Sequence, residues 1–455
     1  MTLKVQAPRE PLFTRRELWQ LVLPLIIEQL LLMTVGIADT MMVASAGETA
    51  VSGVSLVNGI NNLIIQVFAA LSTGGAVVVS QYLGRREQES AGKAAAQLLY
   101  IMLGLSTLLM LIGLFLRGQI LHGLFGRVEP DVMRSAMVYF LLTAAAYPLM
   151  GLYNAGSALF RAMGNSRVSM WCALLVNIIN IGINGALIYG LHMGAAGAGI
   201  GTLVSRGAAA VFMLVLLRRP GQRILLPPLR PVRLSRRMIR SILTIGVPNG
   251  LENGIFQIGK LLVLGLITSF GTAAVAADAI ANSITAVTDV PGFAIGMALI
   301  TVIGHCMGAG EVQQARWYTR RMMPLSMGCM AVSCFILVVF SPSIVPLLDL
   351  SPEASRLAVR IMFICGVGDF FIWPLSFTLP SVLRAAGDAF FTMMVAQCSM
   401  FACRIALSYV FACDWGLGLG LEGVWLAMVV DWIVRAVCFT VRYERGRWES
   451  FQLLK

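Results

Sequence analysis

The chain has 455 residues, of which 58% are hydrophobic and only 12% are charged. Soluble proteins carry roughly 45–50% apolar and about 25% charged residues, so this composition excludes both a soluble protein and a disordered one. The net charge of +12 would indicate nucleic-acid binding in a soluble domain, but in a membrane protein its distribution along the chain decides its meaning. We therefore expect a polytopic helical membrane protein.

Twelve apolar segments are long enough to cross a bilayer, which takes about 20 residues of α-helix. In chain order the predicted spans are residues 18–44, 50–80, 93–116, 132–155, 168–190, 195–217, 241–268, 274–304, 317–340, 355–379, 392–411 and 420–441. Five prolines lie inside these spans, where a bend is tolerated if neighbouring groups satisfy the freed carbonyls: Pro24, Pro148, Pro248, Pro291 and Pro374. The sequence thus predicts an all-α protein with twelve transmembrane helices.

Basic residues are concentrated in the loops on one side of these spans. If the N-terminus is cytoplasmic, most Lys and Arg residues lie in cytoplasmic loops, as the positive-inside rule requires. The Arg-rich connection 218–240 is the largest of these loops, and we interpret it as a solvated linker, with binding of anionic lipid headgroups as the alternative. The excess positive charge is therefore a topology signal, and we expect both termini in the cytoplasm.

The two halves of the chain repeat one unit. A shift of 224 residues aligns Pro24 and Glu28 with Pro248 and Glu252, and the loop motif at 159–165 meets 382–388 to within two residues. We expect an N-terminal six-helix bundle (1–217), the basic linker (218–240) and a C-terminal six-helix bundle (241–455). Six spans per half make this a parallel repeat, an arrangement typical of transporters with a substrate cavity between the halves.

Several motifs resemble the multidrug and toxic compound extrusion (MATE) family, in particular its prokaryotic NorM/DinF-like members. They are VGIADTMMVASAGETAVSGVS in the first span and the loop after it, QYLGRREQESAGKA and ALFRAMGNSR in the loops, and VNIINIGINGALIYG with GAAGAGIGT in the fifth and sixth spans. The resemblance covers essentially the whole chain, in both halves.

This resemblance implies two six-helix bundles in a V, related by a pseudo-two-fold axis. It also implies a secondary active antiporter that exports cationic or amphipathic small molecules, such as drugs and toxins, in exchange for Na+ or H+. We therefore expect a monomeric protein of the bacterial inner membrane whose partners are its substrate and the lipid bilayer. We expect no enzymatic activity, no nucleic-acid partner and no cofactor other than the coupling ion.

Asp39 is the first candidate for the coupling site, because a charge inside a span costs about 2.5–3.5 kcal/mol and therefore indicates function. Asn180 and Asn184 share one face of the fifth span, and Thr202 lies in the sixth at a similar depth. A carboxylate with amide and hydroxyl oxygens suits Na+ as well as a proton on the Asp. The alternative is that the Asn side chains only tie helices together.

The family resemblance points to the same four residues. The N-terminal cation site of the family matches Asp39, Asn180, Asn184 and Thr202, which would be metal ligands if the ion is Na+. Many members have Asp where this chain has Asn184, so this chain carries one charge fewer and the choice between Na+ and H+ stays open.

Glu28 and Glu252 are repeat equivalents, each one turn after a proline at mid-depth of its span. We predict that they attract a cationic substrate from opposite sides of a cavity. The alternative is that they are buried carboxyls that hold helices together. Family members often place a Glu one turn later, where this chain has Phe256, so the match to the family is approximate.

The C-terminal half contains further in-span acids, of which Asp369 and Asp289 are the additional candidates for substrate binding or coupling. Arg404 lies near the repeat equivalent of Asn180, so a fixed positive charge replaces a cation site in this half. Internal ion pairs are the alternative for most of these residues, for example Asp431 with Arg435 at i, i+4.

Two other functions are alternatives to antiport. A lipid or lipid-linked oligosaccharide flippase of the same superfamily is the first, but such proteins carry more basic cavities, whereas acids outnumber bases in these spans. A membrane-embedded enzyme is the second, and the sequence contains no HExxH, GxSxG or P-loop motif to support it.

Overall fold

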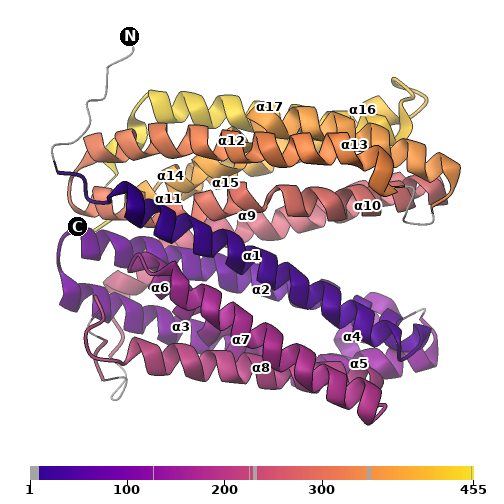
Figure 1. The fold of residues 1–455 in the computed structure, drawn as a ribbon, viewed down its shortest axis with the longest axis horizontal. Coiled ribbons are helices and arrows are strands. Elements are labelled where there is room, and N and C mark those ends of the chain that lie inside the picture. Colours follow the sequence, from indigo (N-terminus) through magenta and orange to yellow (C-terminus); the bar gives the residue numbers. More distant parts are fainter. Residues whose placement is uncertain are drawn as a thin grey trace. The chain divides into compact units, whose positions relative to one another are not determined.

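Figure 1 shows the protein, a computed structural model that describes residues 10–126, 128–224, 226–228, 233–345, 350–451 and 453–454. Within these residues every regular element is helical. The chain forms two compact units, one of Thr14–Gly250 and one of Leu251–Lys455 together with the segment before Thr14. Each unit is described by itself.

The Thr14–Gly250 unit contains the first six predicted spans. Its elements are α1 (Arg15–Ala44), α2 (Glu48–Gly84), α3 (Gln88–Phe115), α4 (Arg117–Phe125), α5 (Pro130–Ala145), α6 (Tyr147–Ala162), α7 (Ser166–Asn184), the π-helical η1 (Gly185–Gly190), α8 (Gly194–Leu217) and the first part of α9 (Arg236–Thr268). Helix α1 packs against α7, and α7 packs against α8. Helix α1 thus lies together with α7 and α8, which are distant from it in sequence.

The second unit repeats this pattern. Its elements are the rest of α9, α10 (Thr272–Thr288), α11 (Val290–Gly308), α12 (Val312–Ile344), α13 (Pro352–Trp373), η3 (Pro374–Thr378), α14 (Leu379–Ala386), α15 (Ala389–Ser399), η4 (Met400–Ala406), α16 (Leu407–Ala412), α17 (Gly420–Glu444) and η5 (Arg447–Ser450). Elements η3 and η4 are π-helical and interrupt longer helices. Helix α17 packs against α13, α16 and η4.

All twelve predicted spans fall on helices, so the predicted all-α membrane fold is confirmed. In the described part of the chain, eleven helices are long and apolar enough to span a membrane, and the α5–α6 pair makes a twelfth. The predicted spans 132–155 and 274–304 are wrong in being continuous. The first bends by 48° between α5 and α6, and the second is interrupted at Asp289. Pro148 and Pro291 lie in the first turns after these breaks, where proline lacks the N–H that would continue the helix.

The connection between the two repeats differs in extent from the predicted linker. Positions 225 and 229–232 of that linker lie outside the described residues, and α9 already begins at Arg236. The boundary between the compact units falls inside α9, after Gly250. The reason is close packing of α9 on α2, since a Cβ on Gly74 would lie 2.8 Å from the backbone nitrogen of Gly246.

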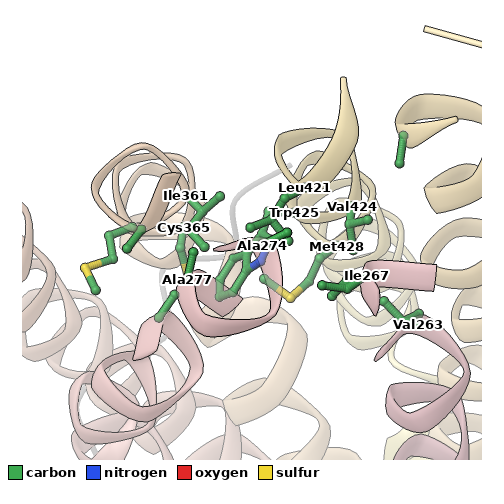
Figure 2. Close-up of a cluster of buried hydrophobic side chains, with 14 of the residues drawn as sticks. Val263, Ile267, Ala274, Ala277, Ile361, Cys365, Leu421, Val424, Trp425 and Met428 are labelled. Carbon is green, nitrogen blue, oxygen red and sulfur yellow. The ribbon is translucent and has the colours of Figure 1, made fainter. Parts of the chain in front are cut away.

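Figure 2 shows a buried apolar cluster in the second unit, with Trp425 near its centre and residues from α9, α10, α13 and α17 around it. The labelled residues are Val263, Ile267, Ala274, Ala277, Ile361, Cys365, Leu421, Val424, Trp425 and Met428. Between helices in a bilayer, such a cluster stabilises by close van der Waals packing rather than by transfer from water.

Candidate functional site: a carboxylate and two amides within the spans

Asp39 of α1 meets the Asn residues of α7, as the sequence predicts. The Asn184 amide donates a hydrogen bond to Asp39 Oδ1 over 2.6 Å and a second to Asn180 Oδ1 over 3.2 Å. Asn180 also lies close enough to interact with the Asp39 carboxylate. Both Asn residues are fully buried, whereas Asp39 is half-buried. The three residues therefore form one cluster, which we call the Asp39 cluster.

Thr202 of α8 lies beside the Asp39 cluster and reaches it through a residue that the sequence did not single out. Its side chain lies close enough to interact with Tyr139 of α5, whose hydroxyl donates to Asn58 Oδ1 of α2 over 3.1 Å. Tyr139 was missed because a Tyr in an apolar span has no sequence pattern that separates it from packing residues. Asn58 matches Asn282 in the repeat, which was its only signal.

Local backbone features hold Asn184 in place. It is the last residue of α7, directly before the π-helical turn η1, and such turns often reorient side chains at functional sites. On the other side, a Cβ on Gly201 of α8 would collide with Asn184 Oδ1. Glycine at position 201 thus leaves the space that the buried amide occupies.

The donor set of the Asp39 cluster fits a monovalent cation. Asp39 supplies a negative charge, and Asn184 Oδ1 is buried without a hydrogen-bond partner in the described structure. Hard cations prefer oxygen ligands of this kind, and a proton on the carboxylate would satisfy the same cluster. Arg206 of α8 lies near enough to act on the Asp39 charge, with its guanidinium 5.6 Å from the centre of the Tyr153 ring.

Glu28 and Glu252 each form a buried ion pair within their own unit. Arg161 Nη1 lies 3.0 Å from Glu28 Oε1, and Ser169 donates to Glu28 Oε2 over 2.6 Å. In the second unit, Arg384 Nη2 lies 2.7 Å from Glu252 Oε1 and Thr392 donates over 3.5 Å. These contacts are those expected of carboxylates that hold helices together, and the repeat preserves them residue by residue.

Asp369 and Asp289 approach each other in the second unit. Asp369 is fully buried on α13 and accepts a hydrogen bond from Cys365 Sγ over 3.1 Å. Asp289, at the break between α10 and α11, lies close to Trp373 and within electrostatic range of Asp369. The Oδ1 atom of each is buried without a partner in the described structure, so oxygens at this site are open to a ligand.

The predicted ion pair between Asp431 and Arg435 on α17 is confirmed, with Arg435 Nε 3.0 Å from Asp431 Oδ1. Arg404 of η4 lies 3.8 Å from the other carboxylate oxygen of Asp431. Two guanidinium groups thus share one carboxylate, and positive charge is in excess in this part of the second unit.

Comparison with known proteins agrees with this fold. The MatE family model matches residues 24–185 and 248–410, one match in each repeat. The uncharacterized transporter YisQ of Bacillus subtilis is 28% identical, over 98% of this chain and 97% of its own length. A probable multidrug resistance protein NorM of Thermotoga maritima is 26% identical over 97% and 94% of the two chains.

A solved structure has the same fold. It is an outward-facing multidrug resistance transporter of the MATE family, with a TM-score of 0.88, 21% identity and coverage of 96% of this chain and 97% of that chain. At that identity the likeness concerns the fold alone. Because the family model covers most of both repeats, the chain belongs to the MatE family of efflux transporters.

Proposed function

We propose that this protein exports cationic or amphipathic small molecules in exchange for Na+ or H+, and that the coupling ion binds at Asp39, Asn180, Asn184 and Thr202. The observation that carries the proposal is the Asp39 cluster itself, a half-buried carboxylate fixed by two buried amides inside the spans. The names of relatives such as NorM support a small-molecule cargo. Bacterial relatives and the loop charges support the inner membrane with both termini in the cytoplasm.

The Asp39 cluster can serve antiport because its occupant changes the balance of charge inside the membrane. An empty carboxylate in a span is unfavourable, so the site favours either a bound cation or a proton. Antiport requires that the ion reaches Asp39 in one conformation of the protein and leaves it in another. Cargo is then released in the conformation in which the ion binds. A rotation of the Asn184 side chain would turn its Oδ1, instead of its NH2 group, toward Asp39. An additional oxygen ligand beside the carboxylate favours Na+ over a proton.

The second unit supplies further candidate ligands for cargo. We propose that Asp369 and Asp289 attract a cationic cargo or ion, since each has an unpartnered carboxylate oxygen. A cargo role for Glu28 and Glu252 requires that the cargo displaces Arg161 or Arg384 from its ion pair.

Transport in everted membrane vesicles tests the coupling site. With a Na+ gradient and a H+ gradient imposed separately, the wild type should accumulate ethidium under one of them. Asp39→Asn keeps the size of the side chain and one acceptor oxygen for Asn184 but removes its charge, so we expect ethidium transport to fall to the level of vesicles without the protein. Wild-type transport rates in a folded Asp39→Asn protein would show that the assignment is wrong.

A further inference from the structure

The second unit contains a pocket, partly open to its surroundings, between α9, α10, η4 and α17. Its polar lining comes from Lys260, Asp278, Asn282 and Arg404, and Trp425 and Met428 form part of its apolar wall. Figure 2 shows Met428 between Trp425 and Ile267 of α9. We call this cavity the Lys260 pocket.

The Lys260 pocket is the repeat counterpart of the Asp39 cluster. The shift of 224 residues places Val263 on Asp39, Arg404 on Asn180 and Asn282 on Asn58. In the last span the shift becomes 226, which aligns Gly194 and Gly197 with Gly420 and Gly423 and places Met428 on Thr202.

The position of Arg404 in this alignment has a structural basis. Arg161 and Ser169 pair with Arg384 and Thr392 at a shift of 223. The π-helical turn η4 (Met400–Ala406) lies between those residues and the end of the span, and such a turn accommodates one extra residue in a helix. The shift therefore becomes 224 at Arg404, which takes the place of Asn180.

The electrostatic character of the two sites is opposite. At the position of the Asp39 carboxylate the pocket has the apolar Val263, and at that of the Asn180 amide it has a guanidinium. Lys260 adds a second positive charge, and in the described structure it forms no ion pair within 4.0 Å. The carboxylate of Asp278 accepts a hydrogen bond from Trp425 Nε1 over 3.0 Å.

Arg404 shares its nearest acid with Arg435. Asp431 lies 3.8 Å from Arg404 but is closer, at 3.0 Å, to Arg435. Arg404 also lies over the Phe256 ring, with its guanidinium carbon 5.0 Å from the ring centre. Among the residues that line the pocket, Lys260 and Arg404 are basic and only Asp278 is acidic, so the lining itself carries a formal positive charge beside an apolar wall. Asp289 outside the lining also acts on the Lys260 charge.

We propose that the Lys260 pocket binds the anionic group of a small aromatic amphiphile, a carboxylate or sulfonate, with Lys260 and Arg404 on the anion and Trp425 and Met428 against the apolar body. Treating such a molecule as cargo rests on the proposed export function, whereas its binding to the pocket does not. The substrate range would then include zwitterionic and anionic amphiphiles as well as cations.

Binding to the purified full-length protein in detergent tests this proposal. The probes are 2-naphthoate and 2-naphthylmethylammonium, which have the same ring system and opposite charge, and isothermal titration calorimetry measures both. We expect 2-naphthoate to bind, Lys260→Met to weaken it at least about tenfold, and Lys260→Arg to stay within about threefold of wild type. No binding of 2-naphthoate, wild-type affinity in Lys260→Met, or equal losses in both variants would overturn the proposal.

A second substitution keeps the test decisive if Lys260→Met does not fold. Val263→Asp restores the carboxylate that Asp39 supplies in the first unit, and Val263→Asn is its uncharged control. We expect Val263→Asp, but not Val263→Asn, to lose 2-naphthoate and to favour the ammonium probe. An unchanged preference in a folded Val263→Asp protein would contradict the proposal.

Two further measurements distinguish this proposal from the proposed coupling site and from binding of a lipid headgroup. Asp39→Asn should lose ethidium export but bind 2-naphthoate like the wild type, so failure of the coupling site and failure of the pocket are distinguishable. Co-purified phosphatidylglycerol that is retained only when Lys260 is present, without binding of 2-naphthoate, would assign the pocket to a lipid headgroup and overturn the proposal.

Discussion

The side chains of Glu28 and Glu252 show how individual carboxylates inside the spans are stabilised by ion pairs and hydrogen bonds. Each carboxylate has an Arg partner and a hydroxyl donor within its own unit. Removing one partner of a buried pair leaves an uncompensated charge, which costs about 3–5 kcal/mol, whereas neutralising both partners costs much less.

Arg161→Met should therefore lower the free energy of unfolding by about 3–5 kcal/mol, and adding Glu28→Gln should restore most of it. Unfolding by SDS in mixed micelles measures the difference. Arg360→Met is the control, because the Arg360 side chain is 67% exposed in its pair with Glu422 and such pairs contribute about 0–1 kcal/mol. Equal losses in Arg161→Met and Arg360→Met would contradict this account of the pair.

The same Glu residues allow a test of their proposed role in cargo binding. Glu28→Gln and Glu252→Gln keep the side-chain shape and remove the charge that a cation would seek. If either residue binds cargo, its variant should have at least about tenfold weaker affinity for ethidium in fluorescence titrations of the purified protein. Wild-type affinity in both variants would leave only the helix-holding role.

Sequence reasoning succeeded for the residues whose chemistry is unusual in a membrane. Asp39, Asn180 and Asn184 stood out because polar groups in spans need partners, and the structure brings them together. It did not find Arg161 and Arg384 as the partners of Glu28 and Glu252, because both lie at helix ends near loops, where Arg is expected from topology alone. Tyr139 was missed because packing explains a Tyr in an apolar span equally well.

At the scale of helices, close approach of α7 and α8 positions Asn184 of the Asp39 cluster. Gly201 faces Asn184 at a distance that excludes any side chain. The helix breaks near Ala146 and Asp289 were not predicted, because a sequence window measures hydrophobicity and does not show whether a proline bends a helix or ends it.

Gly201→Ala should reduce coupled export at least about tenfold without changing any charge, because its Cβ would displace the Asn184 amide from Asp39. Gly207→Ala on the same helix is the matched control, since its Cβ would make only an ordinary contact of 3.6 Å with Leu149. The measurement is the initial rate of ethidium transport at equal protein levels. Similar rates in the two variants would mean that the position of Asn184 does not matter.

At the scale of the whole molecule, one repeated fold carries two different sets of polar residues. The repeat predicted the six-helix halves and the equivalence of Glu28 with Glu252, and both appear in the structure. The polar residues at the equivalent sites could not be predicted from the repeat, because Val263 and Arg404 stand at the positions of Asp39 and Asn180. The two halves thus share the positions that pack the fold and differ in the polar residues at the equivalent sites.

The antiport itself is tested most directly by counterflow in proteoliposomes of the full-length protein. An ethidium gradient is the only driving force, and internal dyes report Na+ and H+. We predict that ethidium movement drives one of these cations in the opposite direction, and that Asp39→Asn abolishes this movement. Ethidium movement without either cation, or cation movement that persists in Asp39→Asn, would contradict the claim that the Asp39 cluster couples export to a cation.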